Sequence, residues 1–318
     1  PFLRAAGFNV AGIVTRNSER IASAKSDFPH ATIFDSTQEV VDSGIDLLVV
    51  ASSNVAHRSD TEVGLKAGIP VVVDKPMGIT YNDVEYLCNL ARSKSVPLTT
   101  YFNRRFDSDA LTIKKVLSQN QLGKVFRLDS RFERFRPEAN PSSWRERLSP
   151  AEGGGNLLDL QPHLVSLALD WFGPAEIVHA SVRSIRGLSD DDVVIVLQHA
   201  SGVDSYLSAS AIVGAPGPRI RLLGDQGALV IEELDKQEPL LRSGHNPQTG
   251  GWTLDTRTPA FLHRGDHVEE IESVPGDYTQ FYVQVKKCLE GVAEMPVSIE
   301  DSLSVARIIE RAREVSIR

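Results

Sequence analysis

Short apolar runs alternate with helix-length segments through the N-terminal third of the chain. The runs expected to form strands are 10–14, 31–34, 46–51, 70–74 and 97–101, and the segments expected to form helices are 18–27, 36–43, 56–67 and 81–93. Run 46–51 is apolar from Leu47 to Ala51, which is typical of a central parallel strand covered on both faces. Strand–helix alternation with short links predicts βαβ units with right-handed crossovers, and therefore a doubly wound parallel sheet. Ligands of such sheets bind at the carboxyl ends of the strands.

The pattern changes after about residue 120, where long strand-like stretches follow one another with few helices between them. Strands are expected at 124–135, 176–185, 192–199, 203–212, 219–223 and 228–232, and helices at 156–172, 278–290 and 300–315. Successive strands without crossover helices predict a large, mostly antiparallel sheet. We therefore predict an α/β Rossmann domain over 1–120 and an α+β domain for substrate binding and oligomerisation over 121–318. The last helices are expected to pack back on the first domain.

Residues 1–7 have the pattern of the end of a helix, and a strand pattern follows at once. The glycine-rich motif G-x-G-x-x-G, which typically follows the first strand of a dinucleotide-binding domain, does not occur in the sequence. We expect that strand and its glycine loop to lie upstream of Pro1.

Composition narrows the classes of function. The formal net charge is -8 over 318 residues, which argues against binding to nucleic acid phosphates. No apolar run approaches the ~20 residues that cross a bilayer, so no membrane span is expected. Cys88 and Cys288 lie in helix-like stretches, which favours reduced thiols and a cytoplasmic protein. The histidines are scattered without metal-ligand spacing, so no metal site is expected.

Lys75 follows the apolar run 70–74 directly, within Asp74-Lys75-Pro76. At the carboxyl end of a parallel strand its ammonium group would face the ligand crevice and stabilise an alkoxide. A solvated lysine at a strand end is the alternative interpretation.

Asp159 and His163 stand four residues apart after the run Gly153-Gly154-Gly155. This spacing predicts that both side chains lie on one face of a helix. Histidine is the natural proton carrier near neutral pH, and a carboxylate one turn away could orient a substrate. A helix-capping aspartate with a core histidine would give the same pattern.

Two further segments favour a dinucleotide. Small polar residues in the segment 51–57 precede a predicted helix, where free amides suit phosphates, although a plain capped helix start would look similar. Thr15 and Arg16 follow the first run, at the place where such folds bind the adenosine ribose. An arginine without an acidic residue there favours NADP over NAD, with NAD still possible; an ordinary surface arginine is the alternative.

Together these motifs resemble the Gfo/Idh/MocA oxidoreductase family, from just inside the first helix to the end of the chain. The residues that carry the resemblance are 52–57, 64–68, Val72-Val73-Asp74-Lys75-Pro76, Leu122-Gly123-Lys124-Val125 and Gly153 to Asp159 with His163. Segments 101–107, 134–137, 144–146 and Asp277-Tyr278 are similar to one branch, which includes NADP-dependent scyllo-inositol dehydrogenases.

The resemblance implies roles for individual residues. Lys75 would be the catalytic lysine, His163 the proton donor or acceptor, and Asp159 its partner in binding substrate hydroxyls. Residues implied to contact the cofactor are Thr15, Arg16, Ser52, Ser53, Asn54, His57, Asp74, Lys75, Pro76, Asn103, Trp144 and Arg145. Residues implied to contact the substrate are Tyr101, Arg105, Gln161 and Tyr278.

The function that these roles imply is hydride transfer between a nicotinamide and a secondary alcohol or ketone of an inositol, sugar or related polyol. A non-catalytic dinucleotide-binding sensor and an NAD-dependent glycosidase on the same fold are the alternatives. By analogy with the family, and because an open sheet face invites pairing, we expect a homodimer or homotetramer.

Overall fold

The computed structural model describes residues 1–248 and 251–316, which form two compact units. The first unit comprises Pro1–Tyr101 and Thr279–Leu303, and the second comprises Phe102–Tyr278 and Ser304–Arg318. The division at residue 101 lies earlier than the boundary that we predicted near residue 120. The reason is the helix α6 (Ser108–Ser118), which the sequence reasoning did not anticipate and which belongs to the second unit.

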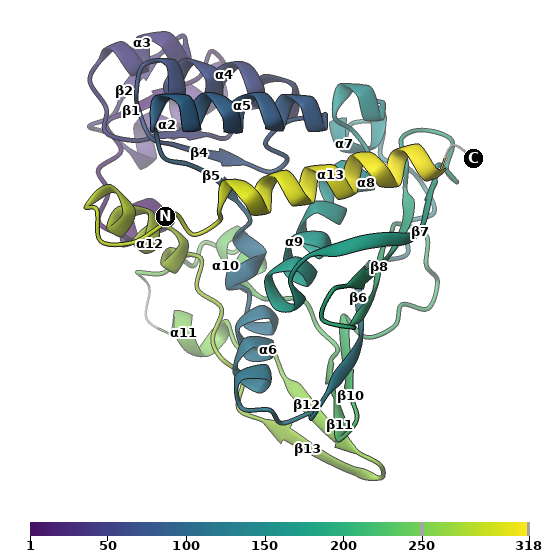
Figure 1. Cartoon of the computed structure of the whole chain (residues 1–318). Helices are drawn as coiled ribbons and strands as arrows, with labels where there is room; N and C mark the ends of the chain where they lie inside the picture. Colours follow the sequence, from purple (N-terminus) through teal and green to yellow (C-terminus); the bar gives the residue numbers. More distant parts are fainter. Residues whose placement is uncertain (249–250, 317–318) are drawn as a thin grey trace. The chain divides into compact units, whose positions relative to one another are not determined.

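The first unit has the parallel strands expected of a Rossmann-like domain (Figure 1). Strand β1 (Gly12–Val14) pairs with β2 (Thr32–Phe34), and β4 (Val71–Asp74) lies between β3 (Leu48–Val50) and β5 (Leu98–Tyr101). Its helices are α1 (Phe2–Ala5), α2 (Ser18–Asp27), α3 (Thr37–Asp42), α4 (Asn54–Lys66), α5 (Tyr81–Lys94) and α12 (Thr279–Leu289). Helix α13 (Ile299–Ser316) begins in this unit and ends in the second.

Burial explains why the apolar runs become strands here. Val71, Val72 and Val73 are all fully buried, as a central parallel strand requires. Helix α5 begins at a capping box, in which Thr80 and Asp83 satisfy each other's backbone amides. Capping and burial therefore fix the positions at which β4 ends and α5 begins.

The second unit is built on an eight-stranded, mostly antiparallel sheet in the order β13-β12-β11-β10-β6-β9-β8-β7. The strands are β6 (Val125–Glu133), β7 (Ala175–Arg183), β8 (Asp192–His199), β9 (Asp204–Ser210), β10 (Ile220–Gly224), β11 (Gly227–Ile231), β12 (Ala260–Arg264) and β13 (His267–Ile271). The pairing of β6 with β9 is parallel, whereas the other pairs are antiparallel. Strands β12 and β13 extend the sheet beyond the strands that we predicted.

The helical elements of this unit are η1 (Asn103–Phe106), α6, α7 (Trp144–Arg147), η2 (Pro150–Glu152), α8 (Asn156–Asp159), α9 (Gln161–Phe172), α10 (Gln237–Arg242) and α11 (Trp252–Asp255). Helix α9 packs against β6 and β9 with Leu164, Val165, Leu167 and Ala168 fully buried. The face of the sheet that α9 covers is therefore the core face of this unit.

The single helix predicted over 156–172 is wrong in one respect, because the structure has two helices there, α8 and α9. Leu160 separates them, and Pro162 stands in the first turn of α9. Proline has no amide hydrogen to continue the ladder of the preceding helix, so the chain starts a new helix at Gln161. Asp159 and His163 consequently belong to different helices rather than to one helical face.

Candidate functional site

Lys75 follows β4 directly, as the sequence predicts. Its backbone amide donates a hydrogen bond to Oδ1 of Asp74 at 2.8 Å, and its side chain is half-buried. The next residues, Pro76 and Met77, are buried, and the Lys75–Pro76 peptide is cis. The hydrogen bond to Asp74 and the burial of Pro76 and Met77 position the backbone from which the ammonium group extends.

The ring of His57, in α4, contacts the backbone of the segment that follows β4. Its Nδ1 lies 2.7 Å from the carbonyl oxygen of Pro76, and its Nε2 lies 3.2 Å from the carbonyl oxygen of Ser52. Both partners are acceptors, so the neutral ring can donate to only one of them. The ring is 1% exposed. His57 thus ties the Lys75 segment to the loop that precedes α4, a structural role that comes in addition to the predicted contact with the cofactor.

The start of α4 offers donors for an anionic ligand. Ser53 is the N-cap residue, and its side chain makes no capping hydrogen bond. The neighbouring hydroxyl of Ser52 donates to Oδ2 of Asp60 at 2.7 Å. Amide groups in the first turn of a helix suit phosphate oxygens. The donor chemistry of this loop therefore fits the pyrophosphate of a dinucleotide.

Thr15 and Arg16 follow β1, again at a carboxyl strand end. The Nε of Arg16 donates to the carbonyl oxygen of Asp35 at 2.9 Å, and the side chain is exposed. Among the described residues, none places a carboxylate within ion-pair distance of this guanidinium group. Arg16 can therefore still bind an anion.

The second unit carries the other predicted catalytic residues, Asp159 at the end of α8 and His163 in the first turn of α9. The His163 ring meets Phe132 of β6 edge to face, with ring centroids 6.4 Å apart, and it is 6% exposed. Asp159 is more accessible, and its Oδ1 lies 3.1 Å from Nε of Arg145. Arg145 in turn lies over the ring of Trp144, 4.4 Å from the centroid. The structure therefore links two residues predicted to contact the cofactor, Trp144 and Arg145, to Asp159.

The glycine run holds these two helices in place. Gly155 has φ +90°, and a Cβ there would lie 2.0 Å from Oδ2 of Asp190. Asp190 uses its other oxygen to accept the amide of Leu157 at 2.7 Å, and the amide of Gly155 donates to the carbonyl of Arg145 at 2.9 Å. Any side chain at Gly155 would disrupt the loop that positions Asp159.

Three of the predicted substrate-binding residues are deeply buried in the second unit. Arg105 donates to Oγ of Ser166 at 2.9 Å, and Gln161 donates to the carbonyl oxygens of Val193 and Leu207. The hydroxyl of Tyr278 donates to Asp107 at 2.6 Å. Each side chain thus has a packing role that the sequence did not reveal, and its contact with substrate stays a prediction.

The other predicted residues divide between the two units. Tyr101 lies in the first unit, where its ring packs against Phe281 and Tyr282. Asn103 begins η1 in the second unit. The first unit holds Thr15, Arg16, Ser52, Ser53, Asn54, His57, Asp74, Lys75, Pro76 and Tyr101, and the second holds Asn103, Arg105, Trp144, Arg145, Asp159, Gln161, His163 and Tyr278.

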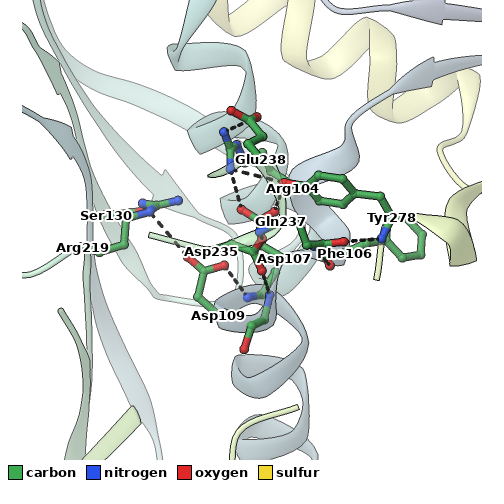
Figure 2. Close-up of polar contacts among 12 residues, drawn as sticks. Arg104, Phe106, Asp107, Asp109, Ser130, Arg219, Asp235, Gln237, Glu238 and Tyr278 are labelled. Carbon is green, nitrogen blue, oxygen red and sulfur yellow. Dashed lines mark hydrogen bonds and ion pairs between the residues drawn. The ribbon is translucent and has the colours of Figure 1, made fainter. Parts of the chain in front are cut away.

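A buried polar network adjoins η1, and the sequence reasoning missed it (Figure 2). The guanidinium of Arg104 contacts Oδ2 of Asp107 at 3.2 Å, and Asp107 also accepts the Tyr278 hydroxyl. A second pair, Arg219 with Asp109, lies 3.5 Å apart with both side chains almost fully buried. The acids stand at the start of α6, so an unrecognised helix concealed the network. The spacing of Ala110, Ile113 and Val116 is the signal that could have revealed this helix.

Burial changes the protonation chemistry of this network. It raises the pKa of Asp107 well above its ordinary value and that of Asp235 to about 6, against the opposing effect of hydrogen bonds to both groups. Burial likewise raises the pKa of the Tyr278 hydroxyl, and the neighbouring Asp107 adds to that shift. The tyrosine is therefore a hydrogen-bond donor rather than an acid in this network.

Comparison with known proteins decides the family. Residues 1–102 match the description "Oxidoreductase family, NAD-binding Rossmann fold", and residues 114–316 match "Oxidoreductase family, C-terminal alpha/beta domain". The chain belongs to the Gfo/Idh/MocA oxidoreductase family. Two matches thus cover most of this Gfo/Idh/MocA protein, one for each half, and they confirm the predicted resemblance.

Several relatives resemble this Gfo/Idh/MocA chain over nearly its whole length. The scyllo-inositol 2-dehydrogenase (NADP(+)) IolW of Bacillus subtilis is 33% identical, over 97% of this chain and 87% of that protein. The trans-1,2-dihydrobenzene-1,2-diol dehydrogenase of Mus musculus is 25% identical, over 96% and 88%. The solved structure of the oxidoreductase yvaA from Bacillus subtilis superposes with a TM-score of 0.88 at 30% identity, covering 100% of this chain and 92% of that one.

These findings establish an oxidoreductase with a nicotinamide-binding Rossmann domain. The first unit fits that cofactor, because the uncapped start of α4 and the exposed Arg16 are donors that phosphates require. No group of three or more His, Cys, Asp or Glu side chains within residues 1–248 and 251–316 could hold a metal ion. Over the same residues, no helix is both long and apolar enough to cross a membrane.

Proposed function

We propose that this protein is an NADP-preferring dehydrogenase that acts on a secondary alcohol or ketone of an inositol, sugar or related polyol. The observation that carries the proposal is the half-buried Lys75 at the carboxyl end of β4. Its backbone amide donates to Asp74, and the carbonyl of the following Pro76 is bound by His57. Membership of the oxidoreductase family and the NADP-linked activity named for IolW support it. When bound, the nicotinamide would accept the hydride from the alcohol carbon or return it to the ketone.

The chain's own residues would manage the proton and the developing charge. His163 would remove the hydroxyl proton, since an imidazole exchanges protons near neutral pH. The Nζ of Lys75 would stabilise the resulting alkoxide oxygen through a charged hydrogen bond. Asp159 would accept a hydrogen bond from a neighbouring hydroxyl and so orient the ring of the substrate.

The test of this proposal is Lys75→Ala against Lys25→Ala, a matched change at an exposed lysine of the same unit. Loss of a general acid–base or charge-stabilising group typically lowers turnover by about 10²- to 10⁴-fold. We expect K75A to lose that much activity on an inositol and aldose panel while still binding NADPH, and K25A to match wild type. Wild-type rates in K75A would contradict the proposal.

The same panel separates the alternatives. A sensor would bind NADPH without oxidising or reducing any polyol, and an NAD-dependent glycosidase would release sugar without net change in the nicotinamide. Either result would contradict the dehydrogenase proposal and favour the corresponding alternative.

The preference for NADP rests on Arg16, whose guanidinium is exposed and aligned by the carbonyl of Asp35. In Arg16→Ala we expect the ratio of kcat/KM for NADP over NAD to fall by about tenfold, as for one charged hydrogen bond. Arg20→Ala, an exposed arginine of α2, is the control that should leave this ratio unchanged. An unchanged ratio in R16A would remove the basis for NADP preference.

We further propose that the outer face of the eight-stranded sheet pairs two copies of the chain in the reducing cytoplasm. This face exposes Tyr206, whose residue is 38% exposed, and the guanidinium of Arg127 lies over its ring at 4.5 Å. Exposed apolar side chains on an open sheet favour association. Light scattering should give at least a dimer for wild type and a monomer for Tyr206→Asp. A wild-type monomer would contradict the proposal.

A further inference from the structure

Arg134 stands just beyond the end of β6, on the core face of the sheet. Its amide donates to the carbonyl of Ser210, and its carbonyl accepts the amide of Val213, so the chain stays extended through this residue. Side chains alternate along extended chain, which puts Arg134 on the same face as Phe132. Phe132 is the residue whose ring meets His163. Arg134 therefore lies on the face of the sheet against which the predicted proton carrier packs.

The charges of neighbouring groups act on Arg134 in both directions. Burial lowers the pKa of Arg134, the nearby Arg136 lowers it further, and Asp159 and Glu146 oppose both effects. The attraction of Asp159 agrees with the placement of Arg134 on the face of the sheet that carries His163.

The guanidinium of Arg134 has no partner within hydrogen-bond or ion-pair distance among the residues that the structure describes. The two nearby carboxylates are already neutralised, Asp159 by Arg145 at 3.1 Å and Glu146 by Arg186 at 3.0 Å. Arg136 is exposed and adds a further positive charge. A partly desolvated guanidinium without a counter-ion is costly, and such a group suits a bidentate anion.

We propose that Arg134 binds a negatively charged group of the substrate, a carboxylate or a phosphate ester, beside the alcohol on which His163 acts. The claim that the bound substrate is oxidised by hydride transfer rests on the proposed function, whereas the claim that Arg134 binds an anion does not. It narrows the substrate class from polyols in general to sugar acids or sugar phosphates. Arg134 is a substrate-binding residue in this account and takes no part in proton transfer.

Calorimetric titration of the NADPH-loaded protein tests the binding directly. The probes are a hexose, its uronic acid and its phosphate ester, which share one carbon skeleton and differ in charge. We expect wild type to bind one of the two anionic probes about 10- to 100-fold more tightly than the hexose, as one charged hydrogen-bonded pair implies. The stronger of the two identifies carboxylate or phosphate as the group recognised.

Variants assign the effect to Arg134. Arg134→Gln should lose the preference for the anion and leave hexose binding within about threefold, Arg134→Lys should restore part of it, and Arg147→Gln in α7 should match wild type. Equal binding of all three probes by wild type, or an unchanged preference in R134Q, would overturn the inference. If R134Q loses the preference but wild type oxidises neither these probes nor any member of the inositol and aldose panel, the inference stands and the proposed dehydrogenase function fails.

Discussion

Replacement of Gly155 by alanine tests whether the glycine run positions the loop that carries Asp159. Gly155 has φ +90° and ψ 160°, a region that is essentially restricted to glycine and costs other residues about 1–3 kcal/mol. The added Cβ would also lie 2.0 Å from Oδ2 of Asp190, so that carboxylate must move. Asp190 would then lose its 2.7 Å hydrogen bond from Leu157, worth about 1.5–3 kcal/mol for a charged acceptor. We expect a total loss of about 2.5–6 kcal/mol.

Gly202→Ala is the matched control for this prediction. Gly202 has φ +86°, and a Cβ there would have no neighbour within 4 Å, so this variant carries only the backbone cost. Both glycines and all three tryptophans, Trp144, Trp171 and Trp252, lie in the second unit. Tryptophan fluorescence during urea unfolding therefore reports on the unit that carries the change.

The close approach of the added Cβ to Asp190 predicts that the free energies of unfolding of the two variants differ by about 1.5–3 kcal/mol, because only Gly155→Ala displaces a hydrogen-bonded carboxylate. In an Asp190→Ala background the excess cost should disappear, since the colliding oxygen is gone. If G155A costs no more than G202A, or if its excess cost persists without Asp190, the reasoning about this loop is refuted.

Three further predictions concern buried polar groups. Arg219→Met should lower the free energy of unfolding by about 3–5 kcal/mol, because it leaves the buried Asp109 without its ion-pair partner. Adding Asp109→Asn to that variant should recover part of the loss. Equal stability of R219M and wild type would contradict this prediction. Burial raises the pKa of Asp190 to about 6, so its contribution to the free energy of unfolding is complete below the ordinary pKa of 3.8 and is lost as pH rises through about 6. The stability of Asp190→Asn should therefore rise by up to about 3 kcal/mol relative to wild type over that range. Parallel pH profiles of stability for the two proteins would contradict this prediction. His57→Leu removes the link between Pro76 and Ser52 and should raise the KM for NADPH severalfold, while the second unit, which does not contain His57, keeps its melting temperature. An unchanged KM would show that this link does not support cofactor binding.

The fold could be predicted from the sequence where local pattern and tertiary environment agree. The runs that became β3 and β4 are apolar because both faces of a central sheet are covered, so their hydrophobicity alone identifies them. Helices α2 and α5 begin where polar caps precede periodic apolar residues. These elements require no knowledge of the rest of the chain.

Elements that depend on distant partners could not be predicted in the same way. Helix α6 starts at Asp107, Ser108 and Asp109, a polar sequence typical of a loop. It is stabilised by Arg219 and Asp235, which lie far away along the chain. The break between α8 and α9 had a visible cause, Pro162, but the i, i+4 spacing of Asp159 and His163 suggested one helix.

In the candidate site, too, some residues could be found from local pattern, whereas others depend on distant partners. Lys75 and Arg16 could be found because they follow strands, and a strand end fixes where a side chain lies. The pairing of Arg145 with Asp159 and the isolation of Arg134 depend on how loops fold onto the sheet, and no local pattern encodes that. Residue type predicted the chemistry of these groups but not their partners.

The central claim is that Lys75 and His163 act on the same alcohol, and isotope transfer tests it most directly. A substrate that carries deuterium on the alcohol carbon should deliver it to C4 of the nicotinamide in wild type. The transfer rate is then measured in Lys75→Ala, His163→Ala and the double variant. Groups that act as a unit have non-additive effects, so the double variant should be about as slow as the slower single variant. Wild-type transfer in either single variant, or rate losses that multiply in the double variant, would contradict the account.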